Sequence, residues 1–201
     1  MARPRIYDDE LRRRLLDTAA ATVAAGGTDA LNLRTMAQEC ETSTSAIYAL
    51  FGSKPAVLAA VAQHSADSFA TSQHAHAPAE SGVADLRALG LAYRQWALDH
   101  PALFQLMFHP TFFAGLESPQ LEDRSNDSIE PLRRAVRRAI AGGEIRFSDE
   151  QAAVLAMWGI LHGMVTLEMG GIEPPAMQLS EKDWLGAFHA ALAGWTTAPL
   201  F

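Results

Sequence analysis

Hydrophobic residues recur along most of the chain at the spacing of an amphipathic helix. In the first such stretch, Leu15, Ala19 and Val23 are four residues apart, which places them on one face of a helix over residues 8–25. Alternating polar and apolar positions, β-branched runs and Asn-Gly turns, which are the signals of strands and hairpins, are missing. The pattern therefore predicts an all-α fold.

Capping residues and helix breakers set the expected boundaries. Asn32, Ser43 and Ser180 stand where a side chain can accept a hydrogen bond from the first turn of a helix. Gly26-Gly27 is expected to end the first helix, because glycine accepts the left-handed conformation. Together with the apolar spacing, these signals predict helices at 8–25, 33–40, 44–50, 54–73, 83–99, 101–107, 125–141, 148–169 and 180–195.

The breaks between these helices suggest how the chain is divided. Residues 72–82 are small and polar and include Pro78, so they are expected to form a loop. Residues 109–123 contain two prolines and are expected to be irregular. We therefore expect an N-terminal domain at 1–70 and a C-terminal domain at 71–201.

Composition narrows the class of protein. Of the 201 residues, 49% are hydrophobic and 19% are charged, which is typical of a soluble globular protein. There is no continuous run of about 18 apolar residues to span a membrane, and the N-terminus lacks the apolar stretch of a secretory signal. The single cysteine, Cys40, cannot form an internal disulfide and is expected to be a small buried residue. A cytoplasmic protein is therefore expected.

The net charge of −7 is unevenly distributed. Residues 1–60 contain seven cations and seven anions, whereas residues 61–201 contain nine cations and sixteen anions. A neutral N-terminal head on an acidic body suits a protein whose head, and not its body, approaches an anionic partner such as DNA.

Residues 33–51 have the pattern of a helix-turn-helix, in which two short helices flank a turn of about three residues. Met36, Ala37 and Cys40 of the first helix are expected to face inward, as are Ile47 and either Leu50 or Phe51 of the second. From spacing alone, a pair of short core helices without a DNA role is an equal alternative. On the outer face, short hydroxyl side chains can approach phosphates and base edges. The residues expected to contact DNA there are Thr42, Ser43, Thr44, Ser45, Ala46 and Tyr48.

Two cations flank this segment. Arg34 starts the first short helix and Lys54 follows the second, so both are expected to grip the DNA backbone on either side. The Tyr48 hydroxyl can also reach a phosphate. The basic arm at residues 2–5 can enter the minor groove or remain a solvated tail, and the sequence favours neither.

A resemblance to a known family covers roughly residues 8–68. The run TSTSAIYALFGSK at residues 42–54, preceded by Met36-Ala37, is similar to the TetR family of bacterial repressors. The Tyr–Phe–Gly–Ser–Lys spacing is the most specific part of the match. The resemblance implies an all-α homodimer with a three-helix DNA-binding head, whose fourth helix leads into a C-terminal helical bundle that forms the dimer interface and a ligand pocket.

The chain departs from the family pattern in two places. Glu41 stands where the turn usually starts with glycine, so a positive φ there would cost about 1 kcal/mol and would set an anion near the DNA. The second short helix, residues 44–50, which would read the DNA bases, carries no cation. Hydroxyl contacts, thymine-methyl contacts and DNA shape would therefore carry more of the sequence specificity.

The long apolar segment near residue 160 resembles the Trp–His–Gly signature of one C-terminal class within the same family. Trp158 and His162 are four residues apart and share a helix face, while Gly159 and Gly163 permit a second helix to approach closely. The resemblance implies that this helix and the last one, residues 184–195, form a four-helix bundle in a dimer. The alternative is an ordinary buried helix pair in a monomer.

Aromatic and apolar side chains of the body are expected to line a pocket for a small-molecule effector. A plain hydrophobic core is the alternative, which burial statistics favour. For His162, bonding to a backbone carbonyl is the preferred expectation in the free protein, and bonding to a ligand is the alternative. The expected lining residues are Trp96, Phe104, Met107, Phe108, Phe112, Trp158 and His162.

No other motif indicates catalysis. His74 and His76 lack the further ligands of a zinc site, and no nucleotide-binding loop, nucleophile elbow or metalloprotease motif occurs. We therefore expect no cofactor, no metal and no enzymatic activity. The main hypothesis is a repressor that binds a double-stranded DNA operator and responds to a small molecule. The alternatives are an interaction module with impaired DNA binding and a small helical enzyme that uses His162 or His109 as a base.

Overall fold

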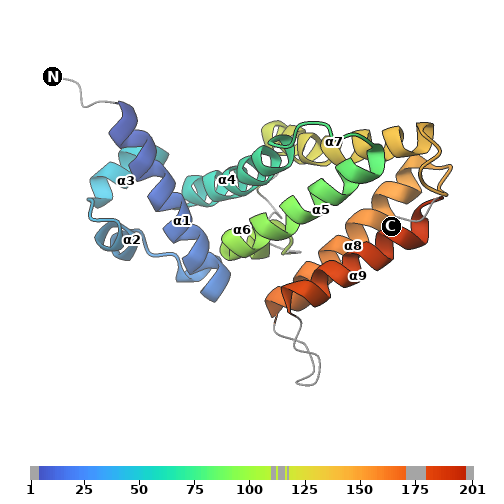
Figure 1. Cartoon of the computed structure of the whole chain (residues 1–201). Coiled ribbons are helices and arrows are strands. Elements are labelled where there is room, and N and C mark those ends of the chain that lie inside the picture. Colours follow the sequence, from blue (N-terminus) through green and yellow to red (C-terminus); the bar gives the residue numbers. More distant parts are fainter. Residues whose placement is uncertain (1–4, 110–111, 113–115, 117, 171–179, 198–201) are drawn as a thin grey trace. The chain divides into compact units, whose positions relative to one another are not determined.

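The computed structural model describes residues 5–109, 112, 116, 118–170 and 180–197. Within these residues every regular element is a helix, apart from one isolated antiparallel bridge between Ile145 and Thr196 (Figure 1). The all-α prediction is therefore confirmed.

The chain forms two compact units, which are described separately. One contains residues 1–68 and 100–125, and the other contains residues 69–99 and 126–201. The predicted boundary after residue 70 separates domains by expected function and not by compactness, so it stays a prediction.

The first unit is built around α1 (Arg5–Ala30), which packs against α2 (Leu33–Glu39) and α6 (Pro101–Met107). Gly27, at φ +76°, interrupts the regular helical backbone of α1. The predicted break at Gly26-Gly27 is therefore present.

After α2, the first unit continues with α3 (Thr44–Phe51) and the start of α4 (Lys54–His74), whose axes differ by 65°. Gly52, at φ +85°, ends α3, and the Ser53 hydroxyl accepts the Ala56 N–H at the start of α4. The core of the unit includes buried apolar side chains from α1 to α4 and Leu31 between α1 and α2: Leu15, Ala19, Val23, Leu31, Met36, Ile47, Val57 and Val61.

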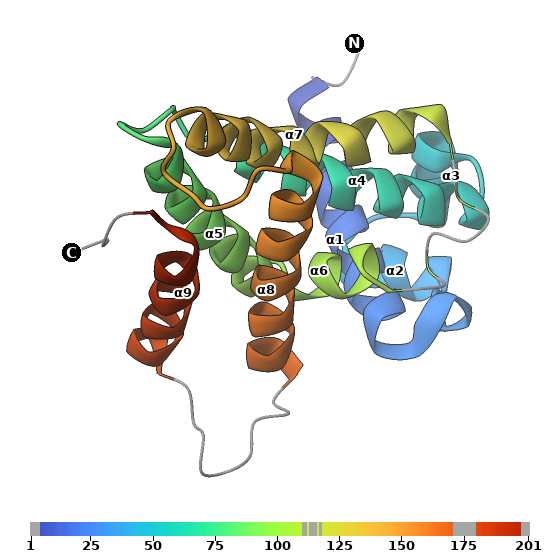
Figure 2. The ribbon, with the colours of Figure 1, turned by 90° about the vertical axis from the view of Figure 1, so that its right-hand side faces the viewer.

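The second unit contains α5 (Gly82–Asp99), most of α7 (Pro119–Ala141), α8 (Glu150–Gly170) and α9 (Glu181–Trp195). In Figures 1 and 2, α8 and α9 run antiparallel side by side, and α5 packs against α8. The core is rich in aromatic and aliphatic side chains: Leu86, Tyr93, Trp96, Val136, Met157, Leu161, Val165, Trp184 and Phe188.

Several helix starts differ from the prediction: α1 begins at Arg5 and not at residue 8, and local caps explain the differences at α7 and α8. Helix α7 begins at Pro119 and not near residue 125, because the Ser118 hydroxyl accepts the Leu121 N–H and proline suits the first position of a helix. The predicted irregular segment therefore ends earlier than expected. Helix α8 begins at Glu150 and not at residue 148, because the Asp149 carboxylate caps it by accepting the Ala152 N–H at 2.7 Å.

An ion pair joins three helices of the second unit. The Arg94 guanidinium on α5 donates to both carboxylate oxygens of Glu168 on α8, at 2.6 and 3.0 Å. It also lies over the Trp184 ring on α9, 4.9 Å from the ring centre. Because Arg94 is only 9% exposed, its charge requires these partners, and they tie α5, α8 and α9 together.

Helix α8 has an exposed apolar side. Leu155 is 61% exposed and Leu167 is 48% exposed. Mean hydropathy reaches 1.5 over an 18-residue window of α8, of which only 28% is buried, so by length and composition alone this helix could cross a membrane. The bent pair α3 and α4 passes the same test if it is counted as one span. A helix that packs against another protein shares these properties, since it too is apolar on more than one side.

The start of α5 is capped from a distant part of the chain. The two carboxylate oxygens of Glu144 accept the N–H groups of Gly82 at 3.2 Å and Val83 at 2.9 Å. These donors have no partner within their own helix, and the helix dipole favours an anion at this end. Glu144 therefore anchors the turn after α7 to the first turn of α5.

Replacing this cap should destabilise the fold. We expect Glu144→Ala to lower the free energy of unfolding by about 1–2 kcal/mol in urea denaturation, as for other lost caps. The matched control is Glu130→Ala, which removes a carboxylate from an exposed ion pair with Arg137 and should cost well under about 1 kcal/mol. Equal losses in the two variants would show that Glu144 acts only as a surface charge.

Candidate functional site

Helices α2 and α3 of the first unit begin at the predicted caps. The Asn32 carboxamide oxygen accepts the N–H groups of Arg34 and Thr35, at 2.9 and 3.2 Å. The Ser43 hydroxyl accepts the Ala46 N–H at 3.1 Å. These bonds satisfy backbone donors that a helix leaves open at its start, so the sequence fixes where α2 and α3 begin.

The turn between the helices is a Schellman motif centred on Glu41. The Thr42 N–H donates to the Ala37 carbonyl at 2.9 Å, and the Glu41 N–H donates to the Gln38 carbonyl at 3.2 Å. Glu41 is the one non-glycine residue with positive φ in the described part of the chain, at +52°. The expected strain at this position is therefore present in the backbone.

The burial pattern sets which side of α3 faces outward. Ile47 is fully buried, and Met36, Ala37 and Cys40 of the preceding segment are at most 5% exposed. The Cys40 thiol lies 3.3 Å from the Thr18 hydroxyl on α1. The inward-facing positions predicted at Met36, Ala37, Cys40 and Ile47 are thus confirmed, whereas Leu50 and Phe51 are both half-buried.

The predicted DNA-contacting residues lie on α3 and on the turn before it, and they differ in exposure. Tyr48 is 55% exposed. Ser43 and Ser45 are also exposed, whereas Thr42, Thr44 and Ala46 are half-buried. The helix thus presents small hydroxyl side chains around one protruding aromatic ring.

The flanking cations are available for an external anion. Arg34 is exposed and Lys54 is half-buried. Neither side chain has a hydrogen bond or ion pair with any residue that the structure describes. Arg12, by contrast, lies over the Phe51 ring at 4.7 Å and braces the end of α3. Of the basic arm, residues 2–4 lie outside the described part of the chain.

Comparison with known families fits this geometry. The family described as bacterial regulatory proteins, tetR family, matches residues 15–61, and the family described as tetracyclin repressor-like, C-terminal domain, matches residues 86–185. Together the two matches cover most of the chain. This protein belongs to the TetR family. The resemblance to the Trp–His–Gly class within that family stays a prediction.

Solved structures share the TetR fold along almost the whole chain. A protein of unknown function from Rhodococcus sp. RHA1 is 27% identical, with 93% of this chain and 96% of that chain covered and a TM-score of 0.75. A TetR family transcription regulator from Marinobacter aquaeolei VT8 is 19% identical, with 96% and 99% covered and a TM-score of 0.76. One from Thermus thermophilus is 20% identical, with 89% and 97% covered and a TM-score of 0.68. No protein with a curated description matches the sequence.

Within the second unit of this TetR protein, His162 belongs to a polar chain. Its Nδ1 lies 2.9 Å from the Tyr93 hydroxyl, and its Nε2 lies 3.5 Å from the Thr166 hydroxyl. Burial lowers the pKa of His162. Burial also raises the pKa of Tyr93, and this effect outweighs a hydrogen bond with the Trp158 side chain, which acts to lower it. A neutral imidazole and a protonated phenol can then bond, with the Tyr93 hydroxyl donating to Nδ1.

Tyr93 is a residue that the sequence prediction missed, and it takes the place of the backbone carbonyl preferred as the partner of His162. Tyr93 and His162 are separated by 69 positions, so no local spacing indicates the pair. The Phe69 ring packs edge-on against Tyr93, with 5.4 Å between centres, and tilted against Trp96, with 4.9 Å between centres.

The predicted pocket residues fall in both units. Trp96, Trp158 and His162 lie in the second unit, where Trp96 is 4% exposed and Trp158 is 37% exposed. The other four lie in the first unit, so the shared pocket stays a prediction. These four residues of the first unit are Phe104, Met107, Phe108 and Phe112. Among them, the ring centres of Phe104 and Phe108 are 5.0 Å apart.

Replacing Glu41 separates backbone strain from charge. We expect Glu41→Gly to raise the free energy of unfolding by about 1 kcal/mol, because glycine accepts positive φ without a Cβ clash. Glu41→Gln keeps the clash and removes only the charge, so its stability should stay unchanged. Thermal denaturation of both variants tests this, and an equal gain in both would place the cost in the charge.

Proposed function

We propose that this protein is a cytoplasmic repressor that binds operator DNA through α3 and leaves it when a small molecule binds the body. TetR family regulators bind DNA, and the observation that supports this surface is the burial of Ile47 behind an exposed, hydroxyl-rich face. Arg34 and Lys54, whose side chains have no hydrogen bond or ion pair with the residues that the structure describes, stand at either end of the same segment. In this proposal α3 enters the major groove while the two cations bind phosphates.

The chemistry of α3 suits a particular mode of base reading. The helix has no arginine or lysine to make a bidentate contact with guanine. Small hydroxyl side chains and Ala46 permit close approach to base edges and thymine methyl groups. We therefore propose that A·T pairs and DNA shape contribute most of the specificity.

Salt dependence of DNA binding tests the role of the cations. We expect fluorescence anisotropy to show saturable binding to a duplex from the region upstream of the protein's own gene. In Arg34→Ala the affinity should fall several-fold for all sequences, and the slope of log K against log salt should fall by about 1 per protomer. The control is Arg13→Ala on α1, whose side chain pairs with Asp17 at 3.2 Å. The proposal would be contradicted if the slope of log K against log salt fell by about 1 in the control as well, or if no specific binding occurred at moderate salt.

One specific observation favours a second possibility, in which the head binds DNA weakly. Glu41 is exposed beside the start of α3, where its charge opposes phosphate binding. If the charge limits binding, Glu41→Gln and Glu41→Gly should both raise the affinity for DNA. If strain in the turn limits it, only Glu41→Gly should do so.

We also propose that α8 and α9 form the dimer interface. Leu155 and Leu167 are exposed on α8, and a Cβ added at Gly159, Gly186 or Gly194 would meet no atom within 4 Å. Exposed apolar side chains with open glycines between them suit close packing against another helix pair. A second copy supplies such a pair, and a two-fold dimer presents two heads to a palindromic operator.

Charge placed on this face should separate the protomers. In Leu155→Arg we expect sedimentation equilibrium to give the monomer mass, with the helical circular dichroism retained because the side chain is exposed in a single chain. Leu98→Arg is the matched control, since Leu98 on α5 is 38% exposed and lies outside the proposed interface. A Leu155→Arg protein that stays dimeric would exclude this interface.

For the effector we propose a pocket that includes Trp96, Trp158 and His162. Tyr93 and His162 supply a hydroxyl and an imidazole among aromatic rings, which suits an apolar ligand with a hydrogen-bonding group. Helix α4 runs unbroken from Lys54, beside the DNA-binding surface, to His74 in the second unit. A ligand that prefers one position of α4 can therefore shift the operator affinity.

A further inference from the structure

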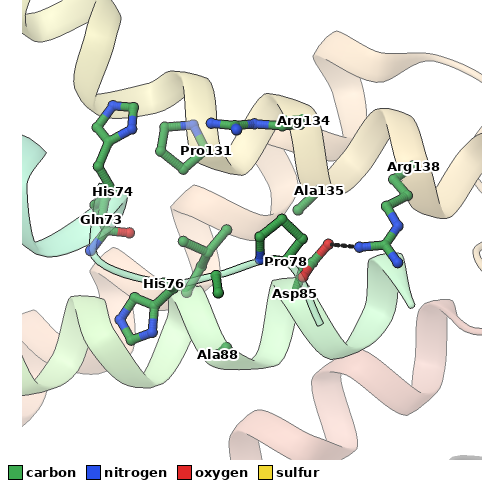
Figure 3. A pocket seen from close by; sticks show the side chains of 12 residues that line it. Gln73, His74, His76, Pro78, Asp85, Ala88, Pro131, Arg134, Ala135 and Arg138 are labelled. Atoms are coloured by element: carbon green, nitrogen blue, oxygen red, sulfur yellow. Dashed lines mark hydrogen bonds and ion pairs between the residues drawn. The ribbon is translucent and has the colours of Figure 1, made fainter. Parts of the chain in front are cut away.

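A separate cavity lies within the second unit, between α7 and the chain that joins α4 to α5. Its volume is about 300 Å³, at the lower end of the range for small-molecule sites. Figure 3 shows Pro131, Arg134 and Arg138 on α7, with the Arg138 guanidinium reaching Asp85 and the Arg134 side chain lying along the helix near Pro131; His76 and Pro78 lie on the joining segment. None of its twelve lining residues belongs to the predicted effector pocket.

The charges around this cavity do not cancel. Asp85 is the acidic group in its lining, and its carboxylate is occupied by Arg138 at 2.6 Å and by the Ala79 N–H at 2.5 Å. Arg134 has no hydrogen bond or ion pair with any described residue. The cavity therefore keeps one uncompensated guanidinium, which can donate two parallel hydrogen bonds to an oxyanion.

Two histidines border the same space in different roles. Pro131 has no N–H, so the Asp127 carbonyl four residues earlier lacks its usual donor in α7. His74 Nε2 lies 3.1 Å from that carbonyl and 3.2 Å from the Asp127 carboxylate, so His74 is held at the cavity edge. The His76 ring makes no hydrogen bond or ion pair with the described residues, so its nitrogens are open to a ligand.

The rest of the lining is apolar. Pro78, Ala88, Leu89, Pro131 and Ala135 contribute carbon surface. A ligand that fits therefore combines an oxyanion with a compact hydrocarbon group, and inorganic ions alone would leave this surface unused.

We propose that this cavity binds a small organic oxyanion, a carboxylate or phosphate monoester, with Arg134 holding the anionic group and His76 donating to it. The site shares no lining residue with the DNA-binding surface or with the proposed effector pocket. It gives the protein a second place at which an anionic metabolite can bind.

Calorimetric titration with matched probes tests this site. Benzoate and phenyl phosphate carry the two oxyanions on the same ring, and benzamide is the neutral counterpart of benzoate. We expect at least one of the two anions to bind with a Kd below about 1 mM, and benzamide to bind at least about tenfold more weakly. The anion that binds more tightly identifies whether the site prefers carboxylate or phosphate.

Two arginine variants locate the binding. Arg134→Gln should lower the affinity for the more tightly bound anion by about tenfold or more. Arg137→Gln should leave that affinity unchanged, because Arg137 is on the same helix but lies outside the cavity and pairs with Glu130. Both arginines are exposed, so thermal denaturation should show both variants folded. The imidazole proton signals of His76 should also shift on binding. Absence of saturable anion binding, or equal binding in Arg134→Gln and wild type, overturns the proposal.

Discussion

The burial of Ile47 is the constraint on which the DNA-binding surface depends. With Ile47 fully buried and Met36 and Ala37 packed beneath α3, the helix has one rotational setting that keeps its apolar face out of water. Rotation by one residue would expose Ile47 and bury Tyr48, whose hydroxyl would then lack water or another partner. The hydroxyl-rich face is thus a consequence of packing, and α3 requires no partner to hold it outward.

The turn before α3 places the helix in this packed position, and its backbone is strained as a result. Its Schellman hydrogen bonds require a left-handed residue, and Glu41 fills that position at φ +52°. The buried contacts on both sides outweigh a strain of about 1 kcal/mol. Folding alone would favour glycine at this position. The glutamate, which lies on the surface proposed to bind DNA, therefore bears on function more than on folding.

The second unit depends more on polar pairs inside its helix layers. Arg94 with Glu168, and Tyr93 with His162, each join α5 to α8. The two pairs begin from adjacent residues of α5, so they set the register between α5 and α8. The same helix face that positions His162 for a ligand is therefore also a structural face, and a ligand that breaks the Tyr93–His162 bond would alter how α5 and α8 pack.

Local signals in the sequence predict most of the helices. Asn32, Ser43 and Ser180 cap helices where expected, because a cap depends on residues within one turn. The start of α7 was missed although Ser118 and Pro119 are a local signal, since two prolines in 109–123 suggested an irregular segment. Contacts between distant segments could not be predicted: Glu144 capping α5, His74 at the Asp127 carbonyl, and Tyr93 at His162 are 53 to 69 positions apart.

The same distinction applies to the functional sites. The face of α3 follows from helical periodicity and one buried side chain, so its residues can be read from the sequence. The cavity beside Arg134 depends on where α4, α5 and α7 meet, which no local pattern in the sequence indicates. Its distinguishing feature is that Arg134 has no partner among the residues that the structure describes, and this becomes visible only when the surrounding acidic groups have been placed.

Hydroxyl-radical footprinting of the protein with and without DNA tests the central claim most directly, because it reports on single side chains. With a duplex that the protein selects from a random pool, oxidation of Tyr48, which is 55% exposed in the free chain, should fall strongly, while oxidation of Trp158 on α8 should not change. Unchanged oxidation of Tyr48 at saturating DNA, with protection elsewhere on the molecule, would contradict the account.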